Sequence, residues 1–180
     1  MHLNNQNIVL IGFMGSGKST LGKKVARRLG CTFVDTDLEI ENRSGCSISK
    51  IFELFGERHF RNLEHTYLQH FIENFKGVVA SGGGMPTHSN NLSILKKIGT
   101  VFYLKRSPKE LSQRLIYAKK QRPLLQDFGD DEIEQFIEIE LAKRIETYEN
   151  AHFVLERHEQ NVETILRIIQ GIKSNEKDKF

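Results

Sequence analysis

Residues 12–20 read GFMGSGKST and contain the pattern G-x-x-x-x-G-K-[ST] at positions 12–19. The stretch follows an apolar run at 8–11 and precedes a helix-like segment at 21–29. Glycines let the backbone turn tightly and bring N–H groups close to phosphate oxygens, and a helix N-terminus adds positive charge. In this pattern Lys18 reaches the β- and γ-phosphates and the Ser19 hydroxyl binds Mg²⁺. A glycine-rich turn followed by a chance Lys-Ser pair explains fewer of these features, so the stretch predicts a nucleoside triphosphate site.

The composition indicates a single globular domain over residues 1–180, with 38% hydrophobic and 27% charged residues. The net charge of +3 arises from 26 basic and 23 acidic residues, which is too balanced to indicate a nucleic-acid or membrane surface. Cys31 and Cys46 form no C-x-x-C pair, so neither a zinc site nor a disulfide framework is indicated. The first apolar run is too short for a signal-peptide core or a membrane span, so we expect a cytoplasmic protein.

Strands and helices alternate along the chain, which predicts an α/β fold with a five-stranded parallel sheet and helices on both faces. The predicted strands are 8–11, 32–34, 78–80, 100–104 and 153–155. The predicted helices are 21–29, 37–44, 47–74, 90–97, 107–119, 131–150 and 161–172. The folded core then spans about 7–172. Residues 119–130 form a candidate mobile lid, and the charged tail 173–180 is expected to be disordered.

Asp35 and Asp37 follow the second predicted strand, at the edge where parallel sheets bind ligands. On an extended chain, residues i and i+2 point to the same side, so both carboxylates would face the phosphate loop. One carboxylate near Mg²⁺ and one near a substrate hydroxyl would suit phosphoryl transfer to an alcohol. The alternative, in which Asp37 is only a helix N-cap, is less favoured beside a phosphate loop.

Residues 55–64, FGERHFRNLE, place Glu57, Phe60, Arg61 and Glu64 on one face of a helix. An arginine beside an aromatic ring, oriented by a carboxylate, can hold a planar anion. Spacing alone favours the alternative of a solvated, salt-bridged face.

Three further features follow later in the chain, and each is weak by itself. The Gly82–Gly84 run offers backbone N–H groups after the third strand, but it could equally be a flexible turn. Residues 122–125, RPLL, would bring Arg122 over the phosphates as part of a lid. Arg144 is one of many charges in its helix. The seven histidines show no metal-ligand spacing.

Taken together, these motifs resemble shikimate kinases in order and spacing over about residues 7–172. The resemblance is carried by the phosphate loop, Asp35-Thr36-Asp37, Glu57 to Arg61 with Glu64, Gly82-Gly83-Gly84, Arg122-Pro123-Leu124-Leu125, and Arg144 with Tyr148. It implies a P-loop kinase fold and transfer of the ATP γ-phosphate, with Mg²⁺, to the 3-hydroxyl of shikimate on the route to chorismate and the aromatic amino acids. It also implies that the helical region 37–74 binds substrate and that the protein is a monomer without nucleic-acid or membrane partners.

The resemblance assigns roles residue by residue. Ser19 and Asp35 would bind Mg²⁺, and Asp37 would contact the acceptor hydroxyls and act as the base, with Lys18 and Arg122 as the other catalytic residues. Arg61 and Arg144 would hold the shikimate carboxylate. The remaining pocket residues implied are Phe52, Phe60, Gly82, Gly83 and Gly84. The nucleotide-binding residues implied are Gly15, Ser16, Gly17, Lys18, Ser19, Thr20, Arg114 and Arg122.

The chain departs from the family pattern at two places that concern adenine. Leu115 stands where the family commonly has an arginine, and Arg114 lies one residue earlier. Residues 156–160, ERHEQ, replace a loop that often contains Asp and ends in Pro. Two alternatives stay open: a related small-molecule kinase acting on gluconate or a nucleoside monophosphate, and a non-catalytic nucleotide-binding module. ADP release assayed across these acceptors would distinguish them.

Overall fold

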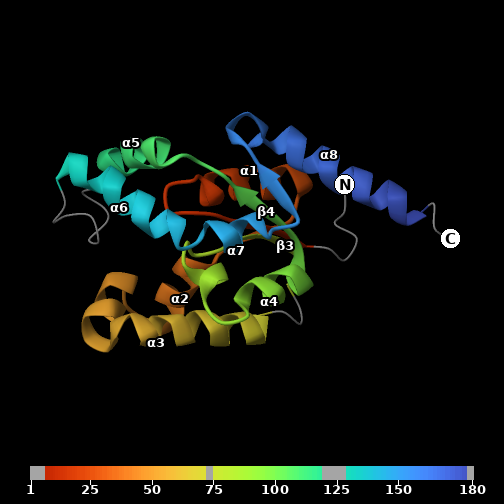
Figure 1. The fold of residues 1–180 in the computed structure, drawn as a ribbon. Coiled ribbons are helices and arrows are strands. Elements are labelled where there is room, and N and C mark those ends of the chain that lie inside the picture. Colours follow the sequence, from red (N-terminus) through yellow and green to blue (C-terminus); the bar gives the residue numbers. More distant parts are fainter. Residues whose placement is uncertain (1–6, 72–74, 119–128, 178–180) are drawn as a thin grey trace.

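The computed structural model describes residues 7–71, 75–118 and 129–177, which form an α/β fold around one parallel sheet (Figure 1). The strands are β1 (Asn7–Ile11), β2 (Thr32–Asp35), β3 (Gly77–Ala80), β4 (Gly99–Leu104) and β5 (Phe153–Leu155). Their order in the sheet is β2-β3-β1-β4-β5, and every neighbouring pair is parallel. The five predicted strands and the fold class are therefore confirmed.

Helices cover both faces of the sheet, as predicted. They are α1 (Lys18–Leu29), α2 (Thr36–Ser44), α3 (Ile48–Phe71), α4 (Asn91–Ile98), α5 (Pro108–Ala118), α6 (Asp130–Ala142), α7 (Ile145–Glu149) and α8 (Val162–Lys177). Two short 3₁₀ turns, η1 (Met85–Thr87) and η4 (Arg157–Glu159), complete the described elements. None of the described helices is long and apolar enough to cross a membrane.

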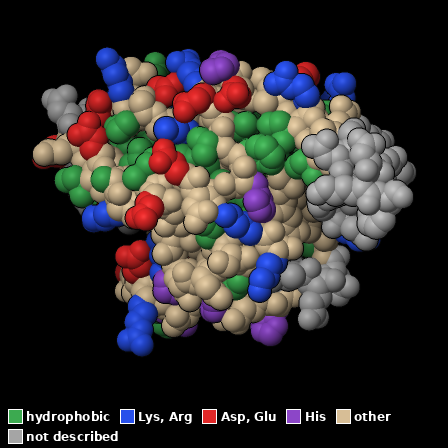
Figure 2. Space-filling model, turned by 45° about the vertical axis from the view of Figure 1, so that its right-hand side comes forward, with side chains coloured by type: hydrophobic (Ala, Val, Ile, Leu, Met, Phe, Trp, Pro, Cys, Tyr) green, Lys and Arg blue, Asp and Glu red, His purple; other side chains and the backbone are tan. Residues whose placement is uncertain are grey.

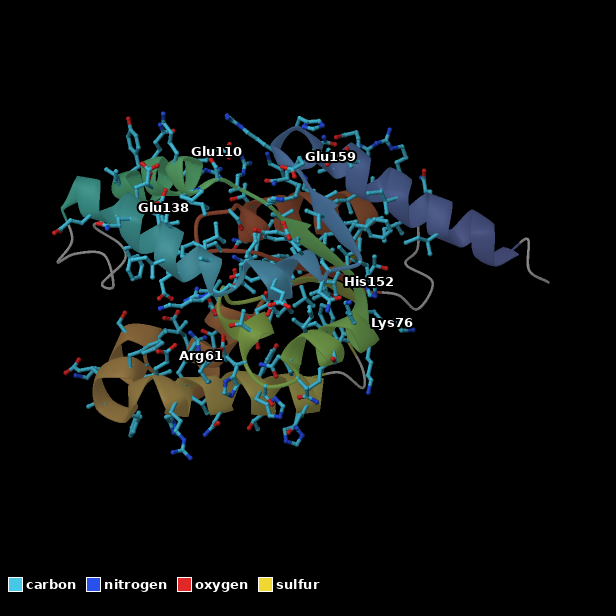
Figure 3. The ribbon with its side chains drawn as sticks, in the orientation of Figure 1. Arg61, Lys76, Glu110, Glu138, His152 and Glu159 are labelled. Atoms are coloured by element: carbon cyan, nitrogen blue, oxygen red, sulfur yellow. The ribbon has the colours of Figure 1, made fainter. Side chains whose placement is uncertain are left out.

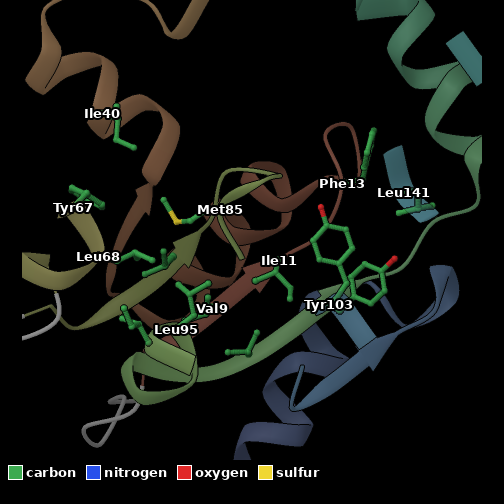
Figure 4. Close-up of a cluster of buried hydrophobic side chains, with 14 of the residues drawn as sticks. Val9, Ile11, Phe13, Ile40, Tyr67, Leu68, Met85, Leu95, Tyr103 and Leu141 are labelled. Atoms are coloured by element: carbon green, nitrogen blue, oxygen red, sulfur yellow. The ribbon is translucent and has the colours of Figure 1, made fainter. Parts of the chain in front are cut away.

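Alternate residues of β1 face two separate apolar clusters, because side chains alternate across a strand. Ile8 and Leu10 pack with residues of α1 and α8 on one face. Val9 and Ile11 pack on the other face with residues of α3, α4, α6 and α7, including Leu68 and Leu95 (Figure 4). The strand is buried on both sides, which explains its continuous apolar sequence.

Two predicted segment boundaries were wrong. The predicted helix 131–150 is two helices, because the chain turns at Lys143 and Arg144 between α6 and α7. The predicted disordered tail begins too early, because α8 continues to Lys177. Lysine and glutamate are good helix formers, so a charged composition is not by itself a reason for a helix to end. Residues 178–180 lie outside the described part of the chain.

The topology gathers three loops at one edge of the sheet. The phosphate loop follows β1, Asp35 ends β2, and Gly82–Gly84 follows β3, which lies between β1 and β2. The backbone N–H of Ser81 donates to the carbonyl of Leu10 at 3.0 Å and joins the ends of β3 and β1. The carboxyl ends of parallel strands are where such sheets bind ligands.

Acidic and basic side chains are interspersed over the molecular surface that Figure 2 shows, in keeping with the balanced net charge.

Candidate active site

The phosphate loop has the backbone that its glycines predict. Gly12, Gly15 and Gly17 have φ values of 141°, 82° and 102°, in a backbone region that residues other than glycine rarely adopt. Lys18 Nζ donates to the carbonyls of Gly12 at 2.7 Å and Phe13 at 3.0 Å, so the ammonium group lies across the loop. The loop and the N-terminus of α1 thus present backbone donors and a positive charge to one concave site.

Arg114 and Leu115, at the first departure from the family pattern, both touch this loop. Arg114 on α5 donates from one terminal nitrogen to the carbonyls of Gly15 at 2.9 Å and Ser16 at 3.3 Å. Leu115 is fully buried and packs beneath Gly15, so it supports the loop from the core and offers no surface to a base. A pocket beside the loop is lined by Thr20, Arg114, Gln160 and neighbouring side chains. Arg114 is therefore the arginine of α5 that borders the candidate nucleotide pocket.

Ser19 and Asp35 form a pair of oxygen ligands at the start of α1. The hydroxyl of Ser19 donates to Asp35 Oδ2 at 2.5 Å. The other carboxylate oxygen of Asp35 accepts from the backbone N–H of Asp37 at 3.1 Å and caps α2. Hydroxyl and carboxylate oxygens are the hard ligands that Mg²⁺ prefers, so the pair fits this ion. The described residues contain no cluster of three or more His, Cys, Asp or Glu that could bind a metal unaided.

Asp37 lies in the first turn of α2, not on an extended chain as predicted, and Asp35 rather than Asp37 is the N-cap. A Cβ built on Gly82 would lie within 3.0 Å of both Asp37 Oδ1 and Glu64 Oε1, so the two carboxylates are close neighbours. Burial raises the pKa of Asp37 to about 6, with Lys18 lowering it and Asp35 raising it further. A carboxylate with this pKa is suited to accept a proton near neutral pH.

Arg61 is held by the two glutamates that helical spacing predicts. Its terminal nitrogens donate to Glu57 at 2.8 Å and to Glu64 at 2.6 Å. The predicted alternative of a solvated face is wrong for the second pair, because Glu64 is only 1% exposed and Arg61 16%. Burial raises the pKa of Glu64 to about 7, although Arg61 lowers it, and nearby Asp37 raises it further. Figure 3 shows Arg61 on the side of α3 that faces the sheet.

Aromatic rings line the approach to Arg61. The guanidinium group lies 5.3 Å from the centre of the Phe60 ring, and Phe60 packs against Phe52 with ring centres 5.1 Å apart. The helix changes direction between these two phenylalanines, at Gly56, whose φ of 77° and ψ of 168° are not helical. This kink was not predicted from the sequence, although Gly56 was the available signal.

Arg144 lies beside the phosphate loop. It is the N-cap of α7, donates to Glu140 at 2.5 Å, and lies 5.2 Å above the ring of Phe13 in the phosphate loop. A Cβ built on Gly83 would lie 3.3 Å from the backbone nitrogen of Met14, so the glycine turn rests against the phosphate loop. The turn at residues 143–144, which the sequence did not predict, is what gives Arg144 this position.

Two hydroxyl groups hold the glycine turn. Thr36 Oγ1 accepts from Gly82 N at 2.8 Å, and the Tyr148 hydroxyl donates to Gly83 O at 2.6 Å. This role of Thr36 was not predicted from the sequence, although its place between Asp35 and Asp37 was a signal. The backbone N–H groups of Gly83 and Gly84 donate to no residue that the structure describes. They are therefore the backbone donors that remain available for a ligand, and a binding role for the turn stays a prediction.

The structure thus brings together Lys18, Ser19, Asp35, Asp37, Arg61, Arg144 and the glycine turn. Arg122 and the lid segment 119–128 lie outside the described residues, so the lid stays a prediction. Residue 130 of the predicted lid is the first residue of α6.

Comparison with known proteins identifies the family. The sequence profile of the shikimate kinases matches residues 14–173. A shikimate kinase of Bacteroides fragilis is 43% identical over 82% of this chain and 82% of its own length.

Solved structures agree with the sequence match. The shikimate kinase of Bacteroides thetaiotaomicron superposes with a TM-score of 0.83 at 36% identity, covering 93% of this chain and 98% of that one. That of Acinetobacter baumannii, solved in complex with shikimate, has a TM-score of 0.80 at 37% identity, covering 96% and 95%. The profile match covers most of the chain, and the close relatives carry the same name and fold. The chain therefore belongs to the shikimate kinase family and is an ATP-dependent kinase.

Proposed function

We propose that this chain binds shikimate around the Gly82–Gly84 turn and that the residues described above carry out phosphoryl transfer to its 3-hydroxyl. One observation carries the proposal: Asp37, Arg61 and Tyr148 come from three separate helices and all meet this turn, beside the phosphate loop. The relative from Acinetobacter baumannii, which binds shikimate, is similar over almost the whole chain.

At the donor end, Lys18 and the N–H groups of the loop stabilise the negative charge of the ATP phosphates. Ser19 and Asp35 hold Mg²⁺, which supplies positive charge to the transferring phosphoryl group when it is bound. The short hydrogen bond between Ser19 and Asp35 holds these two ligands side by side.

At the acceptor end, Asp37 orients the 3-hydroxyl and accepts its proton. The hydroxyl oxygen forms a bond to the γ-phosphorus, the bond between that phosphorus and the bridging oxygen of ADP breaks, and the proton passes to Asp37 Oδ1 or Oδ2. With a pKa of about 6, Asp37 is largely ionised at neutral pH yet basic enough to take this proton.

Arg61 and Arg144 bind the carboxylate of shikimate. A guanidinium group has five N–H donors in a planar fork, and Glu57 and Glu64 use only part of those on Arg61. The free N–H groups of Gly83 and Gly84 provide further donors between the two arginines. A neutral acceptor would leave these donors unpaired, which gives the site its preference for an acid.

We also propose that the protein works as a monomer, because the described site residues of a single chain already meet around the phosphate loop and the Gly82–Gly84 turn. We propose a cytoplasmic location because ATP is the phosphoryl donor. We further propose that residues 119–130 form a lid carrying Arg122, because water must be excluded from the reaction.

The test is a coupled ADP-release assay with shikimate, its methyl ester, gluconate and nucleoside monophosphates as acceptors. Turnover is expected with shikimate and only poorly with the ester. Equal turnover of the ester and the acid would refute the arginine clamp, and preference for gluconate or a nucleotide would refute the acceptor.

A further inference from the structure

We propose that Tyr148 is a positioning residue for shikimate, acting through the hydrogen bond from its hydroxyl to the carbonyl of Gly83. The two oxygens lie 2.6 Å apart and join parts of the chain that are 65 residues distant in sequence. The inference rests on the proposal that shikimate binds at the Gly82–Gly84 turn. It assigns Tyr148 no contact with the substrate.

The other backbone groups of the turn show why this bond matters. Gly82 N donates to Thr36, Gly82 O accepts from Met85 N at 3.2 Å, and Gly84 O accepts from Thr87 N at 3.2 Å. The Gly83 carbonyl has Tyr148 as its partner and no other among the described residues. Tyr148 therefore fixes the one peptide of the turn that backbone bonds leave free to rotate.

That peptide also carries a donor for the ligand. The carbonyl of Gly83 and the N–H of Gly84 belong to the same planar, trans peptide, so they point in opposite directions. Holding the carbonyl against Tyr148 therefore fixes the direction of the Gly84 N–H on the other side of the peptide. Arg61 lies next to Gly84, so this N–H and the guanidinium group belong to the same part of the site. Glycines on both sides of the peptide would otherwise allow it to rotate at little cost.

Tyr148 is itself held rigidly. It is fully buried, and its ring packs against that of Tyr103 with centres 5.0 Å apart. Burial raises the pKa of Tyr148 to about 12, so its hydroxyl keeps its proton and remains a donor. Its backbone N–H donates to the carbonyl of Arg144 at 3.0 Å, one helical turn earlier. Helix α7 thus sets the carboxylate clamp and the glycine peptide together.

Tyr103 provides a matched control from the same pair of rings. It is 1% exposed, and its buried hydroxyl has no hydrogen-bond partner among the described residues. Tyr103→Phe therefore removes a hydroxyl group from the other ring of the same aromatic pair, without breaking the hydrogen bond to Gly83.

The experiment compares steady-state kinetics of wild type, Tyr148→Phe and Tyr103→Phe, varying shikimate and ATP separately. Tyr148→Phe is expected to raise KM for shikimate about 5- to 20-fold, with kcat and KM for ATP changed less than about threefold. Tyr103→Phe is expected to change all three by less than about twofold. Tyr148→p-aminophenylalanine keeps a donor at this position and should restore KM towards wild type.

Equal KM values for shikimate in the two Phe variants would overturn the proposal. So would a loss of ATP affinity as large as that of shikimate affinity, because it would indicate general disruption. If Tyr148→Phe does not fold, poor shikimate affinity in the p-aminophenylalanine variant would also overturn it. Arg61→Lys in the same series distinguishes failure of the Tyr148 proposal from failure of the proposed shikimate site. If Arg61→Lys also leaves KM for shikimate unchanged, the proposed shikimate site itself is wrong.

Discussion

Replacing Gly84 with alanine should weaken shikimate binding by displacing Arg61. Gly84 has φ −84° and ψ −14°, a conformation that alanine adopts without strain. The added Cβ would nevertheless lie 2.5 Å from both terminal nitrogens of Arg61, where ordinary contact needs at least 3.4 Å. The guanidinium group must therefore move by about 1 Å, since attraction turns to repulsion at shorter range.

The size of the effect follows from what Arg61 does. A charge-assisted hydrogen bond is worth about 1.5–3 kcal/mol, and a shift of this size would break at least one to the substrate carboxylate. Because about 1.4 kcal/mol corresponds to a factor of ten, kcat/KM for shikimate should fall roughly 10- to 150-fold. KM for ATP should stay within about twofold, because Lys18 and the phosphate loop are untouched.

Coupled ADP release with varied shikimate measures this effect, with two controls. Gly171→Ala on α8 adds a methyl group where nothing lies within 4 Å, and it should leave the kinetics unchanged. In an Arg61→Ala background Gly84→Ala should have no further effect, because its collision partner is gone. An unchanged kcat/KM for Gly84→Ala, or an equal loss in both backgrounds, would refute the assignment of Arg61.

Three further predictions test the rest of the site. Lys18→Ala should lower kcat by at least about 10²-fold with the thermal unfolding temperature little changed, because it removes charge from the transferring phosphoryl group; wild-type turnover would contradict the kinase mechanism. Asp37→Asn should lower kcat by about 10²-fold or more. Wild-type activity should fall as pH drops through about 6, and the residual activity of Asp37→Asn should not show this fall. Folding raises the pKa of Asp37 from 3.8 to about 6, so the protonated carboxyl group stabilises the fold below pH 3.8 and this stabilisation is lost as pH rises through about 6. Denaturant titrations of Asp37→Asn should no longer show this pH dependence of the unfolding free energy. Arg61→Lys and Arg144→Lys should each raise KM for shikimate without affecting nucleotide affinity, since lysine lacks the planar fork; a change confined to ATP would place them elsewhere.

The sequence predicted the sheet well because its central strands β3, β1 and β4 are buried on both faces and are therefore almost continuously apolar. It failed at residues 143–144, where neither glycine nor proline marks the break between α6 and α7. The bond from Tyr148 to Gly83 and the contact of Arg144 with Phe13 are both long-range, and such contacts override local helix preference. A local pattern cannot contain that information.

In the candidate site too, the sequence predicted which residues pair but not which of them are buried. Helical spacing correctly paired Arg61 with Glu57 and Glu64, but it gave no sign that Glu64 is buried and Glu57 is 63% exposed. The difference arises because the Glu64 side of α3 packs against the Gly82 turn, which follows β3. Similarly, Leu115 could be recognised as a departure from the family, but only the fold shows it packed beneath Gly15.

Burial next to the glycine turn, close to each other, raises the pKa values of both Asp37 and Glu64. Both carboxylates would touch a side chain at position 82, so glycine there is what allows them to approach each other. Their proximity and burial raise both pKa values, which keeps Asp37 basic enough to take a proton while Arg61 keeps Glu64 in place. The three glycines therefore do more than offer N–H groups to a ligand. By lacking side chains they let two carboxylates, an arginine and a tyrosine from three helices converge on one turn.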